Sequence, residues 1–303
     1  MKNVLTTAFA LFLGVAAYAQ DPVNLKFNLG KGKVNQIKSI SKQNIQSNYN
    51  GTPFKTDVNS GATTSFTLLS EENDIMRVEF KFDTIQSKTT SPMRDFETNS
   101  TKPAKKNEYL EKALNRFSTY TIIAKISTTG KFLGFENYKT FRNNVLAVMD
   151  SVPEGKKEQI QKQVDTFVKE SAIQTMIEAM FAYMPEKPVI KTDKWETSYS
   201  LVGGGISGMV FNTYTLDNVI GNNAQLLVES ELESVPSTVE NPNMNIDIKG
   251  KSTGTMSIDM KTGIIMTSKD KKHYEGTMTM KNQGTEIKMP MVIDAESELI
   301  RLK

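Results

Sequence analysis

The sequence predicts a mainly β (α+β) protein in which a large curved antiparallel sheet, or two packed half-sheets, is covered on its apolar face by a central helical segment. Three observations predict this class. Apolar and polar residues alternate in many short segments, glycine-containing turns separate these segments, and one central stretch repeats its apolar residues at threes and fours instead. Parallel sheets are buried on both faces and have unbroken apolar runs, so the alternation favours antiparallel pairing.

The alternating segments recur along the chain after residue 20. Successive strand side chains point to opposite faces, so each segment has one apolar face and one face for water. By this pattern we expect roughly ten or eleven strands. The clearest apolar sets are Val23/Leu25/Phe27/Leu29, Met76/Val78/Phe80/Phe82, Met244/Ile246/Ile248, Met256/Ile258/Met260 and Ile287/Met289/Met291/Ile293.

Turn residues agree with this division. Gly30 and Gly32 are expected to separate the first two strands, and Gly130 and Gly263 to provide the left-handed residue of two hairpins. Residues 86–108 are polar and contain two prolines, so we expect a long mobile loop. Residues 202–208 are expected to form a glycine-rich bend.

The central stretch predicts one long helix and a shorter one before it. Ser151 and Glu154 have the spacing of a capping box, and the helix must stop near Pro185. The shorter helix is expected over residues 138–149. A sheet with a bare apolar face needs a cover, which this helical pair would provide. The apolar stripe of the long helix is Ile160, Val164, Phe167, Val168, Ser171, Met176, Ile177, Met180, Phe181 and Met184.

The expected organisation is a signal peptide at 1–19, an N-terminal β half at 20–136, a helical segment at 137–187 and a C-terminal β half at 188–303, integrated into one domain. A hairpin around Gly130 in one half and around Gly263 in the other leaves a duplication open.

The leader predicts export. Lys2 precedes an apolar run, and Ala17 and Ala19 are the small residues that signal peptidase requires, so we expect cleavage after Ala19. A membrane anchor is the alternative, but the run is shorter than the roughly 20 residues of a span, and no later run approaches that length. The periplasm is the expected compartment, with the extracellular space as the other possibility.

Composition excludes several chemistries. The chain has no cysteine, which excludes disulfides, thiolate metal sites and a cysteine nucleophile. Removing the leader takes away Lys2 and no acid, so the formal charge falls from +3 to +2. This balance gives no reason to expect nucleic acid as a partner. No cofactor and no metal are expected.

Three short motifs resemble a family of secreted Bacteroidota proteins of unknown function. They are the opening strand with residues 30–33, Pro185 to Val189 followed by Asp193-x-Trp195, and the hairpin over 254–263. The resemblance implies a sheet-plus-helix envelope protein and assigns no catalytic residue. Thr192 departs from the pattern, because a glycine often precedes the aspartate there, and this concerns the local turn only.

Several motifs have a structural interpretation. Residues 203–208 satisfy G-x-G-x-x-G, but strand residues rather than a helix follow, which disfavours a dinucleotide site. The sole histidine, His273, is expected on the wet face of a strand. Asn241, Asn243, Asn245 and Asp247 lack the glycine and glutamate of a calcium loop and fit the polar face of a strand. Thr84 and Ser151 lie in three-residue matches to an O-glycan acceptor, which stays open. Trp195 is expected to be a packing anchor.

The sharpest site hypothesis is an apolar groove between sheet and helix. The chain contains 16 methionines, and thioethers adapt to irregular apolar shapes. Methionines that simply fill the core are the alternative. The candidate ligand-binding residues are Phe80, Phe167, Met176, Met180, Met184, Met278 and Met280.

Three functions are therefore weighed. The first is a non-enzymatic envelope protein that binds a lipophilic small molecule or an envelope partner in this groove, with the 86–108 loop near its rim. The second is a structural or interaction protein without a small ligand. The third is a hydrolase that uses a pair of carboxylates, whose spacing the sequence does not show.

Overall fold

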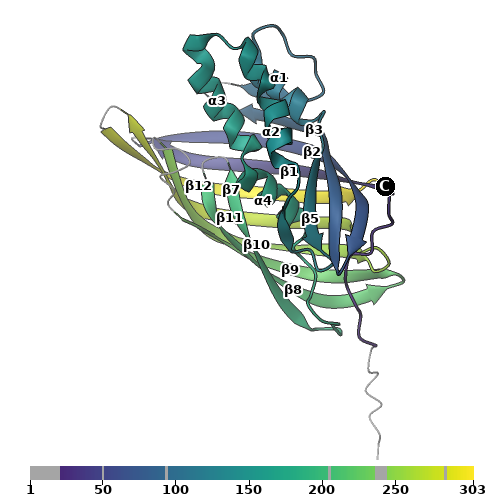
Figure 1. The fold of residues 1–303 in the computed structure, drawn as a ribbon. Coiled ribbons are helices and arrows are strands. Elements are labelled where there is room, and N and C mark those ends of the chain that lie inside the picture. Colours follow the sequence, from purple (N-terminus) through teal and green to yellow (C-terminus); the bar gives the residue numbers. More distant parts are fainter. Residues whose placement is uncertain (1–20, 50, 93–94, 204–205, 236–243, 283–284) are drawn as a thin grey trace, which may run out of the picture.

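The computed structural model describes residues 21–49, 51–92, 95–203, 206–235, 244–282 and 285–303, so the predicted leader and its cleavage site lie outside the described residues. One antiparallel sheet of twelve strands dominates this part of the chain (Figure 1). The strands are β1 (Val34–Tyr49), β2 (Thr52–Glu72), β3 (Ile75–Thr90), β4 (Phe96–Asn99), β5 (Ile122–Ser127), β6 (Phe132–Phe135), β7 (Lys194–Gly203), β8 (Ile206–Ile220), β9 (Asn223–Ser234), β10 (Met244–Asp259), β11 (Ile265–Asn282) and β12 (Thr285–Arg301).

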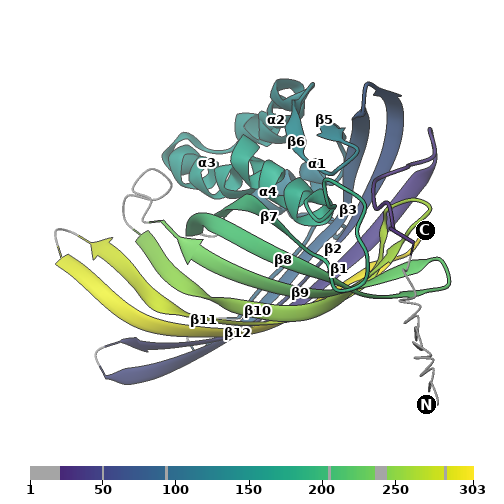
Figure 2. The same ribbon diagram turned by 90° about the horizontal axis from the view of Figure 1, so that it is seen from below.

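The strand order is β6-β5-β3-β2-β1-β12-β11-β10-β9-β8-β7, and β4 pairs with β3 outside this path. The first and last long strands pair in the middle, with Ile37 opposite Arg301. The predicted halves are thus joined into one sheet. Figure 2 shows that this sheet curves into a trough, with the helices on its concave side.

The helices pack over one end of the concave face. They are α1 (Tyr109–Phe117), α2 (Tyr138–Leu146), the 3-10 helix η1 (Ala147–Ser151), α3 (Glu154–Val168) and α4 (Glu170–Phe181). The predicted inward set of β3 is confirmed, since Phe80 is fully buried and contacts the rings of Phe66 and Phe181. We call the core formed here the first apolar cluster. Its members include Phe66, Met76, Val78, Phe80, Phe82, Phe117, Phe141, Val164, Ile173, Ile177, Phe181, Leu226 and Ile258.

The segment predicted as the opening strand is buried but is not a strand of the sheet. Leu25, Phe27 and Leu29 belong to the first apolar cluster as expected from their alternation. Only Val23 forms a bridge, with Val189. The backbone N–H of Phe27 donates to Thr128 O, so the segment crosses the sheet end instead of joining a ladder. Gly30 and Gly32 therefore do not separate two strands.

The long helix predicted after residue 151 is two helices. Lys169 adopts an extended conformation with ψ 144° between α3 and α4. The break lets α4 run along β7 while α3 packs against α1. The predicted capping box is also wrong, because Pro153 is the N-cap residue and the Ser151 hydroxyl donates to Val148 O, 2.8 Å away.

Residues 86–108 contain secondary structure in place of part of the predicted long loop, with residues 93–94 outside the described residues. They complete β3 and form β4, which pairs with β3 from Phe96 opposite Thr89 to Asn99 opposite Gln86. Helix α1, which follows directly, was not predicted, and it buries Phe117 against Phe82. A polar composition concealed β4, whose partner is the end of β3 a few residues earlier, and α1, which packs against a more distant part of β3.

The predicted hairpin glycines are confirmed. Gly130 and Gly263 have φ of 87° and 75°. A Cβ on Gly130 would lie 1.9 Å from Phe181 O, so this turn needs glycine for close packing against α4 as well as for its backbone. Thr192, where the resembling family often has glycine, is also left-handed at φ 72°. The local turn therefore keeps its shape without the glycine.

Candidate functional site

A second apolar cluster lies on the same concave face, farther along the long strands. All of its members come from strands, whereas helices supply many members of the first cluster. The buried members are Leu232, Ile246, Ile248, Met291 and Ile293, and the partly buried ones are Ile45, Leu201, Ile206, Val210, Tyr274 and Met278. Strands β1 and β7 to β12 all contribute, so this part of the trough has a continuous apolar lining.

Inward-facing polar residues lie between the two clusters, and we call them the polar belt. By strand parity the belt contains Tyr199, Asn212, Ser230, Ser252, Asp270 and Lys272. Ser230 donates to the Asn212 amide oxygen over 2.6 Å, and Lys272 Nζ lies 3.0 Å from Asp270 Oδ2. Gly250 and Gly254 flank Ser252 on β10, and Cβ atoms there would lie 2.1 Å from His273 O and 2.3 Å from Lys269 O, so the close approach of β11 requires glycine at both positions.

The electrostatics of the belt connect it to α4. Burial, together with the nearby charges of Asp270 and Glu178, raises the pKa of Tyr199 to about 12. Burial also raises the pKa of Tyr274 and that of Glu178. Glu178 Oε1 accepts from the Gln174 amide, while its buried Oε2 has no hydrogen-bond partner among the described residues. The carboxylates of Asp270 on β11 and Glu178 on α4 thus both lie near enough to Tyr199 to raise its pKa.

The structure divides the predicted ligand-binding residues. Phe80, Phe167, Met176, Met180 and Met184 belong to or pack against the first apolar cluster, and Met278 packs against the second. Met280 is partly buried on β11, opposite Met244. One groove lined by all seven is therefore not formed, and Met278 is the predicted residue at the strand-only end.

A cleft of about 790 Å³ opens where α4 ends, and we call it the edge cleft. This volume is within the range of ligand pockets, roughly 300–1,000 Å³. Met184 and Trp195 form part of its wall, with Trp195 stacked on Tyr214 and its Nε1 donating to Tyr183 O at 3.0 Å. The predicted packing role of Trp195 is confirmed. The cleft is lined by residues 129–132, 178, 182, 184–187, 189 and 193–198.

Strand β7 is an edge of the sheet and presents its backbone to this cleft. The N–H of Leu216 donates to Asp193 O, so by alternation the main-chain groups of Trp195 and Thr197 point to β8 and those of Glu196 and Ser198 point away from it. Farther along, Thr175 of α4 caps the same edge. Its hydroxyl donates to Ser200 O at 2.7 Å and accepts from Val202 N at 3.1 Å.

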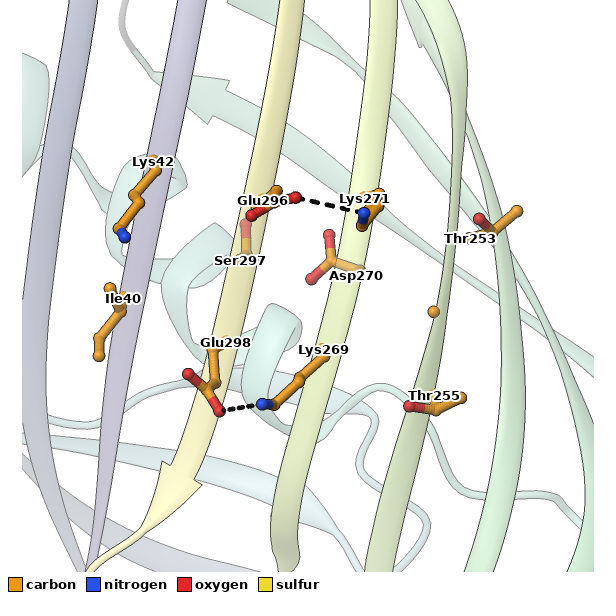
Figure 3. Close-up of a pocket in the computed structure, with 11 residues that line it drawn as sticks. Ile40, Lys42, Thr253, Thr255, Lys269, Asp270, Lys271, Glu296, Ser297 and Glu298 are labelled. Atoms are coloured by element: carbon orange, nitrogen blue, oxygen red, sulfur yellow. Dashed lines mark ion pairs between the residues drawn. The ribbon is translucent and has the colours of Figure 1, made fainter.

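The convex face is charged. Acidic residues of β9 and β12 flank basic residues of β10 and β11 across it, and ion pairs join Lys251 to Glu231, Lys271 to Glu296 and Lys269 to Glu298 at 2.6, 3.4 and 3.0 Å. Figure 3 shows the last two pairs in a shallow hollow of about 530 Å³ that spans β1, β12, β11 and β10. Long exposed side chains pair here, so this face is suited to water.

His273 lies on this charged face, as predicted, with its side chain 58% exposed. Nδ1 is 2.7 Å from Asp294 and Nε2 is 3.2 Å from Glu275. Hydrogen bonds to these two carboxylates raise the pKa of His273. Both ring nitrogens contact carboxylates, an arrangement that favours the protonated imidazole.

The remaining motifs occupy strands and turns. Gly203 ends β7 and Ile206 begins β8, so the glycine-rich motif joins two strands, although residues 204–205 lie outside the described residues. Asn245 and Asp247 lie on β10, and Asn241 and Asn243 lie outside the described residues. In the described ranges, no group of three or more acidic, histidine or cysteine side chains could hold a metal ion. None of the described helices is long and apolar enough to cross a membrane.

Sequence reasoning missed Glu178 and Thr175. Both lie on the predicted helix, but neither belongs to its apolar stripe. A polar residue at each of these positions, three apart on the face next to the apolar stripe, was the available signal. The role of these two residues could not be predicted, because it depends on their contacts with β7, which follows the helix in the sequence.

Comparisons with solved structures give low similarity. A lipovitellin structure described for its lipid–protein interactions has a TM-score of 0.48 and 9% identity over 91% of this chain, which spans only 26% of the lipovitellin chain. An outer membrane channel from Pseudomonas putida F1 has a TM-score of 0.26 and 6% identity, with 90% and 97% of the two chains covered. An exported protein with a YmcC-like fold from Bacteroides fragilis has a TM-score of 0.16 and 10% identity, with 92% and 100% covered. These values do not transfer a function.

The sequence comparisons assign a family. No curated protein matches the chain. The model of a family of unknown function, DUF6263, matches residues 73–265, which include α1 to α4, the edge cleft and all of β10. The match extends over more than half of the sequence, and the chain belongs to the DUF6263 family.

Proposed function

We propose that this protein is an exported, non-enzymatic envelope protein that binds a lipid-like molecule on the concave face of its sheet. The observation that carries the proposal is the second apolar cluster, which continues the lining of the trough with strand side chains alone. Partly buried Tyr274 and Met278 give an apolar ligand access to this lining. The predicted leader at residues 1–19 supports export.

The chemistry of the site suits an amphiphile. Burial of apolar surface contributes about 25 cal/mol per Å², so an acyl chain that covers a few hundred Å² of the second cluster gains several kcal/mol. The polar belt next to the cluster has a tyrosine hydroxyl, a carboxylate and an ammonium within reach of a polar head group. The methionines adapt to chains of different shape.

A pair of variants on adjacent residues tests this function. Met278 faces the trough and Thr277 faces the convex side of the same strand. The probe is a fluorescent long-chain fatty acid titrated into the purified protein, with native mass spectrometry for co-purifying lipids. Met278→Lys places a charge in the apolar lining, and we expect it to weaken binding by about tenfold or more. Thr277→Lys is the matched control and should bind as the wild type does.

Two results would refute the proposal. One is a wild-type protein that shows neither a co-purifying lipophile nor saturable probe binding, which would favour a structural or interaction protein without a small ligand. The other is equal loss of binding in both variants, since a general charge effect would explain it. Circular dichroism on both variants confirms that the sheet is retained.

A carboxylate-dependent hydrolase is the second candidate, because Glu178 and Asp270 both act on Tyr199. A raised pKa suits Glu178 to general acid catalysis. Hydrolysis of chromogenic esters and glycosides that disappears in both Glu178→Gln and Asp270→Asn would support it. Activity that survives both changes would exclude this pair.

A further inference from the structure

We propose that the edge cleft is a docking site for the amino-terminal segment of a partner polypeptide, which adds to β7 as an extra antiparallel strand. This site is separate from the concave lining described above. It rests on the unpaired edge of β7, on the helix that blocks one end of that edge, and on the carboxylate at the blocked end.

The edge supplies the backbone partners. Glu196 and Ser198 direct their N–H and C=O groups into the cleft, and neither has a backbone hydrogen bond on that side among the described residues. An exposed row of such groups is a template for another extended chain. From Lys194 to Ser198 the edge is about 17 Å long at roughly 3.4 Å per residue, which matches a five-residue peptide.

Helix α4 limits the length of the added strand. The Thr175 hydroxyl already satisfies Ser200 O and Val202 N, so an incoming strand cannot continue past Ser198. Natural sheets protect edge strands in this way. The helix ends at Phe181, and the part of β7 beyond its reach remains open to the cleft. An added peptide must therefore end or turn away at Ser198.

Glu178 lies at the blocked end and favours an amino terminus there. It is one helical turn from Thr175 on the side of α4 that faces β7, and its buried Oε2 lacks a partner among the described residues. An ammonium group would supply the missing donors and neutralise the carboxylate. A peptide whose amino end meets Glu178 runs from Ser198 towards Lys194, which is antiparallel to β7.

The test uses a short β-forming probe on the full protein. The probe is the amidated pentapeptide Thr-Val-Thr-Val-Thr with a free amino terminus, compared with its acetylated form. We expect the free form to bind at least about tenfold tighter, because a charge-assisted hydrogen bond contributes about 1.5–3 kcal/mol. Glu178→Gln should remove this difference, while Glu186→Gln, in the same cleft, should preserve it.

Backbone variants test the strand addition itself. Ser198→Pro removes the N–H that points into the cleft but no bond to β8, since edge strands tolerate proline at such positions. It should abolish binding, whereas Ser198→Ala keeps the N–H and should bind normally. In amide NMR spectra, binding should shift the signals of Glu196 and Ser198 more than those of Trp195 and Thr197.

Any one of the following outcomes would overturn the proposal. They are unchanged affinity in Ser198→Pro, no saturable binding of either peptide up to about 1 mM, and equal affinities of the free and acetylated forms. Self-association of the protein that Ser198→Pro abolishes would also overturn it, because it would assign the edge to a second copy of the chain.

Discussion

The two ends of the concave face are built from the same alternating strands but differ in what covers them. At one end, four α-helices and the segment with Phe27 pack on the strands, and Phe80 is fully buried between aromatic rings. At the other end, the strands alone form the apolar cluster around Ile248, and Met278 stays partly exposed. The first end is a closed core shared by helices and strands, whereas the second leaves apolar strand side chains partly exposed, which is the basis of the proposed ligand site.

The largest expected effect separates these ends directly. Phe80→Ala removes a fully buried ring and should lower the free energy of unfolding by about 3–5 kcal/mol. Met278→Ala should lower it by less than about 2 kcal/mol, because the side chain is only partly buried. Urea denaturation of both variants measures the difference. Equal losses would mean that the second end is as much a structural core as the first.

A smaller effect is expected where α4 meets β7. Thr175→Val keeps the shape of the side chain but leaves Ser200 O and Val202 N without partners. The variant should lose about 1–3 kcal/mol of stability. Hydrogen exchange of the Val202 amide should accelerate more than that of Leu201, whose backbone pairs with β8. Unchanged exchange at Val202 would show that the helix does not protect this edge.

The convex face should contribute little. Lys271→Ala breaks an exposed ion pair with Glu296, and such pairs contribute about 0–1 kcal/mol. We expect a change in the free energy of unfolding below about 0.5 kcal/mol, and less in high salt. A larger loss would show that the charged ladder stabilises the sheet as the concave clusters do.

The smallest expected effect is a shift in the pKa of His273. Because the chain has a single histidine, its imidazole NMR signals are identified without further assignment. Asp294 and Glu275 raise the pKa of His273 above its ordinary 6.5, and Asp294→Asn should bring the midpoint back towards that value. Because the folded-state pKa is raised, the favourable interaction is present below pH 6.5 and is lost as the pH rises through the raised pKa. A midpoint that Asp294→Asn leaves unchanged would contradict the observed contact.

Much of the fold could be predicted locally. The inward positions of β3, the left-handed glycines at 130 and 263 and the surface position of His273 all followed from spacing and turn chemistry. The break at Lys169 could not be predicted, because it depends on the packing of α4 against β7. The strand β4 was missed for another reason, since its partner in β3 is near in the sequence but its residues are mostly polar and show no apolar alternation. The candidate site was predicted only in part, since Met278 was named but Glu178 was not.

The sequence by itself determined which side chains share a face, because alternation and helical periodicity are properties of neighbouring residues. It thereby determined a sheet with one apolar face, a helical cover and a polar outer surface. Only the tertiary structure decided how far the helices reach along that face, and that β7 keeps an open edge beside Glu178. These features depend on contacts between elements that are distant in the sequence, and the local spacing of residues does not determine such contacts.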